Sequence, residues 1–213
     1  CDTAREFARR EVAPKAKELD ETGRYPKEII AQLAEMGFMG MMVPTEYGGA
    51  GLDAISYVIA MEEISAGCAS TGVIMSVNNS LSCYPLQAFG SEEQKQKYLV
   101  PLASGKKLGC FALSEPANGS DAGALRTIAK REGDHYILNG TKNFITNGRE
   151  AETCILFATV DAAKGNKAIT AFILEKGMPG FTVGKLEDKL GINASSTAQL
   201  HLENVKVPVA NRL

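Results

Sequence analysis

Two hundred and thirteen residues, 45% of them hydrophobic and 23% charged, have the composition of an ordinary globular protein. This composition excludes disordered, collagen-like and disulfide-scaffold proteins, and the length is enough for one domain or two small ones. Lysine and arginine number 23 against 25 aspartate and glutamate, so the net charge of −2 leaves no basic surplus for a nucleic-acid partner.

Helical patterns come first in the chain. Apolar or small residues at helical spacing from Asp2 to Leu19 predict an amphipathic surface helix. Pro26 is suited to open a second helix, which Gly37 ends. Glycines and a proline then predict an irregular connection as far as Asp53, which is a predicted N-cap of the next helix.

Residues 64–91 carry no charge, which raises the question of a membrane span. Six serines, two asparagines and a proline make this stretch too polar for hydrocarbon, so it is predicted to form one or two helices in the protein interior. Ser91 followed by Gln94 predicts a capping box, with a helix running to about Ser104.

The five cysteines are odd in number and widely spaced, and they form no CxxC pair. Neither a disulfide framework nor a zinc site is predicted, and a reducing compartment is expected. Because the chain starts with neither Met nor a signal segment, we expect that something upstream has been trimmed or left out.

Beyond Gly105, β-branched and aromatic runs replace the helical pattern. Residues 135–146 predict a hairpin with Asn139 and Gly140 as a two-residue type I′ turn. Further strands are predicted at 109–113, 126–131, 152–160, 168–175 and 197–203. Helices followed by strands predict an α+β fold with two segregated domains, an all-α domain over 1–106 and an all-β domain over 107–213.

The segment 110–123, CFALSEPANGSDAG, contains the strongest candidate for a functional loop. A strand is predicted to end there, and the small residues after it would let backbone amides approach an anion closely. From the residues alone, two interpretations stay open: a phosphate or cofactor loop, and an ordinary surface turn.

Three motifs together resemble the acyl-CoA dehydrogenase family. They are FALSEPANGSD (111–121), LNGTKNFITNG (138–148) and DKLGINASST (188–197), the last followed by VKVP (205–208). The resemblance covers the family's amino-terminal and middle domains, and the sequence is most similar to the short-chain, butyryl-CoA branch of the family. It implies a helical domain followed by a barrel-like β domain, with the family's carboxy-terminal helical bundle absent from this sequence.

The resemblance also implies FAD as cofactor, a short-chain acyl-CoA as substrate and an electron-transferring flavoprotein as electron acceptor. In the family a carboxylate takes the α proton while the β hydrogen leaves as hydride to the flavin, so the product is a 2-enoyl-CoA. Carried over by motif position, the expected flavin contacts are Phe111, Ala112, Leu113, Ser114, Ser120, Phe144, Ile145 and Thr146.

Phe144 should stack on the flavin, where many family members have Trp, and Thr146 should place its hydroxyl near the reacting nitrogen. Without the motif, an inward-facing strand aromatic and a turn-satisfying Thr would be the alternatives. Ser120 is also expected to contact the CoA moiety. Leu81 and Tyr84 fall where the family builds its acyl pocket, with plain hydrophobic core as the alternative.

The family's catalytic Glu lies in the carboxy-terminal domain, so no catalytic residue is expected in this sequence and the 213 residues alone are predicted not to turn over. Glu115 is expected to be a polar neighbour of the cofactor. Lys142 and Lys189 are expected to be solvated, with loop orientation or a phosphate contact as alternatives. His135 and His201 are expected to be half-exposed strand residues, and no metal site is expected.

We therefore expect a piece of a longer, FAD-dependent acyl-CoA dehydrogenase. The full-length parent is expected to be a homo-oligomer, a tetramer, in the bacterial cytosol or, alternatively, the mitochondrial matrix. Two other functions are considered: a non-catalytic module that binds flavin or acyl-CoA, and a relative of the acyl-CoA oxidases with the same fold.

Overall fold

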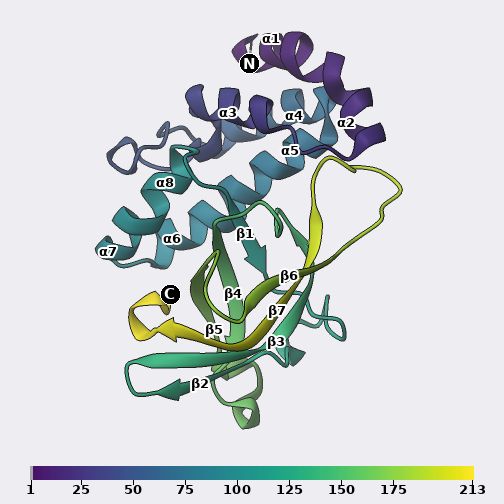
Figure 1. Cartoon of the computed structure of the whole chain (residues 1–213). Coiled ribbons are helices and arrows are strands. Elements are labelled where there is room, and N and C mark those ends of the chain that lie inside the picture. Colours follow the sequence, from purple (N-terminus) through teal and green to yellow (C-terminus); the bar gives the residue numbers. More distant parts are fainter. Residues whose placement is uncertain (1) are drawn as a thin grey trace. The chain divides into compact units, whose positions relative to one another are not determined.

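The computed structural model describes residues 2–213, which divide into a helical unit and a β unit. The helical unit holds the chain up to Leu108 together with the loop Asp188–Ser196, and the β unit holds Gly109–Glu187 and Thr197–Leu213. Figure 1 shows helices in the first half of the chain and strands in the second, so the expected α+β fold is confirmed.

Eight α-helices of the helical unit are described. They are α1 (Asp2–Phe7), α2 (Ala16–Thr22), α3 (Lys27–Glu35), α4 (Ala54–Gly67), α5 (Ala69–Ser76), α6 (Tyr84–Phe89), α7 (Glu92–Gln94) and α8 (Val100–Ala103). Several of these helices are joined into longer ones by π-helical turns at Ala8–Val12, Val77–Cys83 and Lys95–Leu99 and by a 3-10 turn at Ala13–Lys15. No helix among residues 2–213 combines the length and the apolar character needed to cross a membrane.

The helix starts predicted from local residues are present. The Asp53 carboxylate accepts a hydrogen bond from the backbone N–H of Ser56 at 2.7 Å, which satisfies one of the unpaired donors at the start of α4. Ser91 and Gln94 form the predicted reciprocal capping box, with Ser91 Oγ accepting from the Gln94 N–H and Gln94 Oε1 accepting from the Ser91 N–H.

Two buried asparagines fasten the irregular connection between α3 and α4 to the uncharged helices. Asn79 donates to the carbonyls of Phe38 and Met75 and accepts from the Met41 N–H at 2.8 Å. Asn78 donates to the carbonyl of Met39 at 2.8 Å. The prediction that residues 64–91 lie in the interior is therefore only partly confirmed: Asn78 and Asn79 are buried with hydrogen-bonded amides, whereas Leu81, Tyr84 and Phe89 are exposed.

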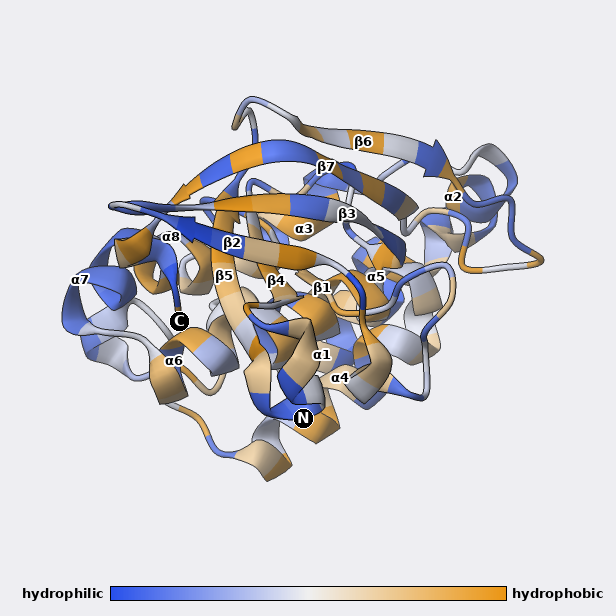
Figure 2. Ribbon diagram, turned by 90° about the horizontal axis from the view of Figure 1, so that it is seen from below, coloured by the Kyte–Doolittle hydropathy of each residue, from blue (hydrophilic) through white to orange (hydrophobic). Residues whose placement is uncertain are grey.

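One curled, seven-stranded sheet makes up the β unit. Its strands are β1 (Gly109–Ala112), β2 (Ile128–Glu132), β3 (His135–Thr146), β4 (Thr153–Thr159), β5 (Ile169–Glu175), β6 (Phe181–Leu186) and β7 (Thr197–Pro208). The order is β1-β4-β2-β3-β7-β6, with β5 pairing β4. Figure 2 shows hydrophobic and hydrophilic residues alternating along β7, and its buried side chains enter the core of the sheet.

The Asn139–Gly140 hairpin prediction is wrong. β3 runs without a turn through both residues, and the hairpin joins β2 to β3 instead, with Gly133 and Asp134 between the paired residues Glu132 and His135. Gly140 lies at a register shift in the pairing of β3 with β7. A Cβ at this position would lie 2.4 Å from Thr127 Oγ1, so glycine is required for a close approach and not for a turn.

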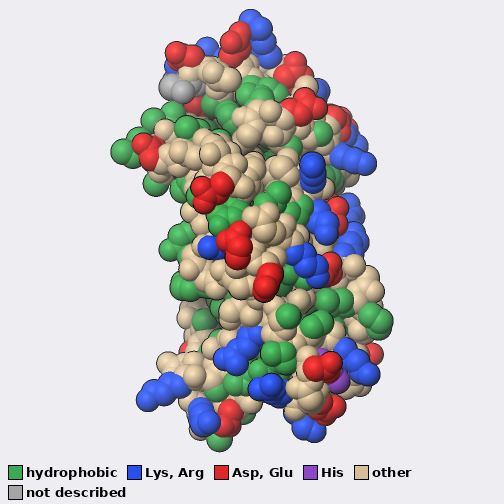
Figure 3. Space-filling view, turned by 90° about the vertical axis from the view of Figure 1, so that its left-hand side faces the viewer, with side chains coloured by type: hydrophobic (Ala, Val, Ile, Leu, Met, Phe, Trp, Pro, Cys, Tyr) green, Lys and Arg blue, Asp and Glu red, His purple; other side chains and the backbone are tan. Residues whose placement is uncertain are grey.

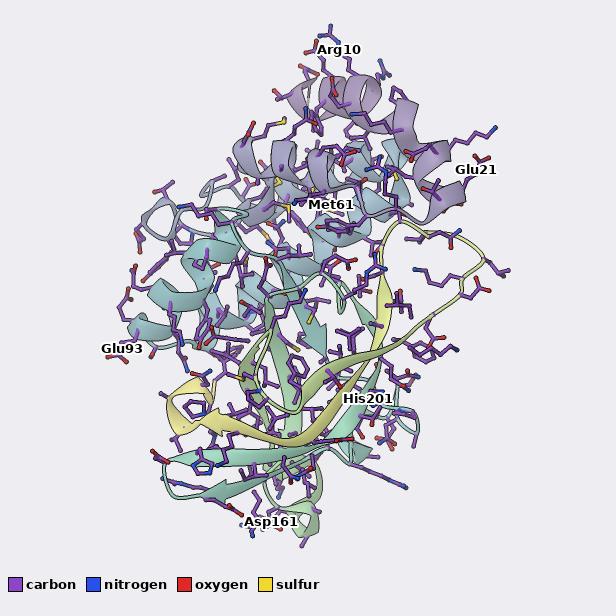
Figure 4. The ribbon with its side chains drawn as sticks, in the orientation of Figure 1. Arg10, Glu21, Met61, Glu93, Asp161 and His201 are labelled. Atoms are coloured by element: carbon purple, nitrogen blue, oxygen red, sulfur yellow. The ribbon has the colours of Figure 1, made fainter. Side chains whose placement is uncertain are left out.

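β6 was not predicted from the sequence. Its burial does not follow the strict in-and-out alternation expected of a strand, and its pairing with β7 contains a register shift. His201 of β7 pairs with Thr182 of β6 (Figure 4), and both His135 and His201 are half-buried strand residues as expected.

Candidate functional site

The end of β1 carries the first group of predicted flavin contacts. Ala112 is fully buried in the core of the β unit, so only its backbone is available to a ligand. Phe111 is half-buried on the opposite side of the strand, and its ring lies 4.9 Å from that of Phe157. Leu113 and Ser114 follow the last strand residue and are half-buried. Phe111 and Ser114 are therefore partly accessible at the point where the strand ends.

The loop after Ser114 is closed by its own backbone. Glu115 and Asn118 exchange hydrogen bonds, with the Glu115 N–H donating at 2.8 Å and the Asn118 N–H at 3.0 Å. The Asn118 amide also donates to the carbonyl of Ala124 at 2.6 Å, which ties the far side of the loop back. Ser120 lies within this closed loop and is exposed. The loop is therefore a built structure that presents Ser120 to solvent.

A bulge in β3 carries the second group of predicted flavin contacts. The pairing of β3 with β7 shifts register between Lys142 and Ile145, and Phe144 within this gap has a φ of 58°. An aromatic residue in the left-handed region is uncommon, and such a conformation persists only where the surrounding structure holds it. Phe144 is 62% exposed, whereas Ile145 is buried in the core and Thr146 is half-buried. The alternative of an inward-facing aromatic is thus wrong for Phe144.

The structure brings the two groups together. The Asn143 N–H donates to the Ser114 carbonyl at 2.8 Å, one residue before Phe144. Lys142 Nζ donates to the Leu113 carbonyl at 3.0 Å. The segment that ends β1 and the bulge of β3 therefore lie side by side, although 29 residues separate Leu113 from Lys142 in sequence.

Lys142 is not solvated, which corrects the expectation for this residue. Its side chain is fully buried and lies 2.8 Å from the carboxylate of Glu115, which is itself 5% exposed. No local pattern around Lys142 signals this burial, because the partner comes from another motif. Lys189, in the loop of the helical unit, donates to the Ser195 carbonyl at 2.5 Å and so orients that loop.

Electrostatics fix Glu115 as a carboxylate. Burial alone would raise its pKa, but hydrogen bonds from Lys142 and from the backbone N–H groups of Arg126 and Thr127 outweigh burial and lower the pKa to about 2. Burial lowers the pKa of Lys142, and the hydrogen bond to Glu115 offsets part of that effect. A carboxylate of such low basicity that is already paired is poorly suited to take a proton from a substrate.

The expected acyl-pocket residues lie in the helical unit. Leu81 and Tyr84 are three residues apart on consecutive helical turns, and they are 38% and 56% exposed. They are neighbours on one side of the helix and are not core residues, so the core alternative is wrong for both. Cys83 between them is fully buried, and burial raises the pKa of its thiol to about 12.

The arrangement at β1 and β3 fits a flat, polar ring system. Phe144 offers an exposed aromatic face, and the half-buried hydroxyls of Ser114 and Thr146 have no hydrogen-bond partner among residues 2–213. An exposed aromatic face can stack on a heteroaromatic ring, and hydroxyls without a partner can bond to the polar atoms of such a ring. On the face shown in Figure 3, acidic and basic side chains are interspersed, so that face has no large basic patch.

Comparison with known proteins agrees with the motifs. Residues 1–106 match the acyl-CoA dehydrogenase N-terminal domain, and residues 110–205 match the acyl-CoA dehydrogenase middle domain. The short-chain specific acyl-CoA dehydrogenase of Clostridium acetobutylicum is 54% identical over 98% of this chain and 55% of its own length. The mitochondrial short-chain specific enzyme of Homo sapiens is also 54% identical, over 97% of this chain and 50% of its own length.

Among solved structures, butyryl-CoA dehydrogenase from Megasphaera elsdenii superposes with a TM-score of 0.95 at 46% identity. The match covers 100% of this chain and 56% of that chain. The chain thus spans about half the length of the curated relatives it matches. Because both units match in order and about half of the residues are identical, this chain belongs to the acyl-CoA dehydrogenase family, whose cofactor is FAD.

Proposed function

We propose that this chain forms the helical and middle-domain part of an acyl-CoA dehydrogenase that oxidises short-chain acyl-CoA thioesters to 2-enoyl-CoA with FAD. The observation that carries the proposal is the exposed Phe144 on its left-handed bulge, joined to the Ser114 segment by the Asn143 hydrogen bond of 2.8 Å. The short-chain preference is supported by the identity to short-chain specific and butyryl-CoA dehydrogenases.

The residues of the β unit bind and orient the cofactor in this proposal. Phe144 would stack on the flavin ring, and the Ser114 and Thr146 hydroxyls would donate to its polar atoms. Phe111 and Leu113 contact the ring edge. Ala112 and Ile145 contribute through their backbones only, since their side chains are in the core. When bound there, FAD would supply the acceptor for the hydride from the β carbon of the thioester.

Three further residues are assigned to ligand binding. Ser120 is assigned to the FAD pyrophosphate and the CoA moiety, and Leu81 and Tyr84 are assigned to the acyl pocket. Ser120 lies in the closed loop after β1, where small residues and backbone amides suit the FAD pyrophosphate and the CoA moiety. Leu81 and Tyr84 supply an exposed apolar surface on one helix side. A bulky Tyr84 would limit the depth of an acyl pocket and favour short chains.

No residue of this chain is assigned as the catalytic base. Glu115 is the buried acid of the first motif, and its burial, its ion pair with Lys142 and its pKa of about 2 all disfavour that role. The base is the Glu that the family carries in its carboxy-terminal domain. The 213 residues alone are therefore predicted not to oxidise substrate.

The partner and compartment follow from the same assignment. The proposed electron acceptor is an electron-transferring flavoprotein, and the full-length parent is proposed to be a homo-oligomer, a tetramer. The bacterial cytosol is the proposed location, with the mitochondrial matrix as the alternative, because similar enzymes are found in bacteria and in mitochondria.

The test is a titration of the purified chain with FAD, followed by an anaerobic visible spectrum before and after butyryl-CoA. We expect FAD binding without bleaching of the flavin band, and bleaching with a full-length relative measured in parallel. Phe144→Leu should weaken FAD binding by about tenfold or more. The matched control, Phe89→Leu, changes an exposed phenylalanine of the helical unit and should leave binding unchanged.

Four results would contradict parts of this proposal. Bleaching by the chain alone would place a base within the 213 residues, with Glu115 as the first candidate. Absence of FAD binding would refute the flavin site. Rapid reaction of the reduced full-length protein with oxygen, faster than with any flavoprotein acceptor, would favour the oxidase alternative. Flavin or acyl-CoA binding by a parent that never reduces the flavin would favour the non-catalytic module.

A further inference from the structure

The buried ion pair of Lys142 and Glu115 has no part in the function proposed above. Taking two charges out of water is costly, and apolar side chains of similar size are often as stable or more stable in such a position. The two side chains are 0% and 5% exposed, so solvent provides little compensation. Stability alone therefore does not account for this pair.

The hydrogen bonds of the pair connect three separate segments of the β unit. Lys142, on β3, donates to the Glu115 carboxylate and to the Leu113 carbonyl. Glu115 also accepts from the backbone N–H of Thr127 at 2.9 Å and of Arg126 at 2.6 Å, just before β2. The pair thus fixes the end of β1 and the entry to β2 onto the same point of β3.

This point lies next to the residues assigned to the flavin. Lys142 immediately precedes the bulge, and the Asn143 N–H holds the Ser114 carbonyl at 2.8 Å. Phe144, with its left-handed φ of 58°, follows directly. Lys142 therefore holds both neighbours of Ser114, Leu113 and Glu115, against the residue at which the bulge begins, so the separation of Ser114 from Phe144 depends on the ion pair.

We propose that Lys142 and Glu115 are positioning residues, whose buried ion pair sets the separation between the Ser114 segment and the Phe144 bulge and so shapes the flavin-binding face. This inference rests on the proposed function. The two residues act through the backbone that they hold, and neither needs to contact the ring.

The test compares Lys142→Met with the double variant Lys142→Met/Glu115→Gln in the full 213-residue chain. The double variant leaves no unpaired buried charge, so we expect it to fold. It can be measured in place of the single variant if Lys142→Met does not fold. Lys130→Met is the matched control, because Lys130 belongs to the same unit and to an ion pair, but its side chain is 77% exposed. Hydrogen exchange of single amides measures the positioning without any cofactor.

We expect the Asn143 and Thr127 amides to exchange about tenfold or more faster in both Lys142 variants, because the bonds that hold them lose their anchor. The Phe172 amide of β5 should be unchanged and serves as the internal reference. FAD affinity should fall by about tenfold or more, and the visible circular dichroism of the bound flavin should change. The double variant should unfold at higher urea than Lys142→Met and still bind FAD weakly.

Unchanged exchange at Asn143 in a folded variant would overturn the inference. Weakened FAD binding with unchanged exchange would also overturn it, because Lys142 would then act through its charge. If the unmodified chain binds no FAD, the proposed function fails and the flavin part of this inference fails with it. Exchange at Asn143 would still decide whether the pair holds the two segments together.

Discussion

Gly140→Ala is the most informative test of how the β unit is packed. The added Cβ would lie 2.4 Å from Thr127 Oγ1, 2.8 Å from its Cβ and 2.9 Å from its Cα. Carbon atoms in favourable contact are about 3.5 to 4.0 Å apart, so β3 and the entry to β2 would have to separate by roughly 1 Å. The Thr127 N–H also donates to Glu115, so the shift would disturb the ion pair.

The expected loss of stability has two parts. Forcing extra volume into a packed interior costs about 1 to 3 kcal/mol. Gly140 has a φ of 156°, where an alanine is strained, and such strain costs on the order of 1 to 3 kcal/mol. We therefore expect the free energy of unfolding to fall by about 2 to 5 kcal/mol, measured by urea denaturation with far-UV circular dichroism.

Two glycines of the same unit serve as controls. Gly119→Ala meets no atom within 4 Å and has no left-handed φ, so it should change stability by less than about 0.5 kcal/mol. Gly133→Ala also meets open space but has a φ of 63°, so it isolates backbone strain at about 1 to 2 kcal/mol. If Gly140→Ala were no more destabilising than Gly133→Ala, the close approach to Thr127 would not limit the packing.

Four further outcomes are expected. Asn79→Ala removes the hydrogen bonds to Phe38, Met41 and Met75 and leaves buried backbone groups unpaired, so urea denaturation should show a loss of about 2 to 5 kcal/mol. Thr146→Val should weaken FAD affinity or slow flavin reduction in the full-length parent, and unchanged values of both would contradict its assigned contact. Tyr84→Ala in that parent should shift kcat/KM from butyryl-CoA towards octanoyl-CoA, and an unshifted ratio would count against the pocket wall. The pKa of Glu115, lowered from 4.5 to about 2, means that the fold favours the ionised over the protonated carboxyl: this contribution to stability is complete above pH 4.5 and is lost as the pH falls towards 2. Glu115→Gln should therefore flatten acid unfolding in this range, by at most about 3 kcal/mol.

Features set by nearby residues could be predicted from the sequence. The Asp53 cap and the capping box of Ser91 and Gln94 are formed by side chains that reach backbone groups three residues away, so the local pattern contains both partners. The order of helices and strands, and hence the fold class, follows from the change in hydrophobic periodicity near residue 106. The motifs added the family, which neither composition nor periodicity could supply.

The Asn139–Gly140 error shows where local reasoning fails. The dipeptide is a strong turn signal when considered alone, but pairing of β3 with β7 extends the strand through it. Gly140 is needed because Thr127, thirteen positions earlier, comes too close for any side chain. The turn that joins β2 to β3 lies at Gly133 and Asp134 and was not predicted from the sequence.

The sequence by itself determined the fold class, the helix starts, the family and its cofactor, because each depends on neighbouring residues or on a motif that can be read directly. Only the tertiary structure decided that Phe144 is exposed on a left-handed bulge and that Lys142 is buried against Glu115. Both depend on partners from distant strands: β7 sets the register shift, and the loop after β1 supplies the carboxylate. Burial and backbone strain are properties of these long-range contacts, and no local pattern specifies them.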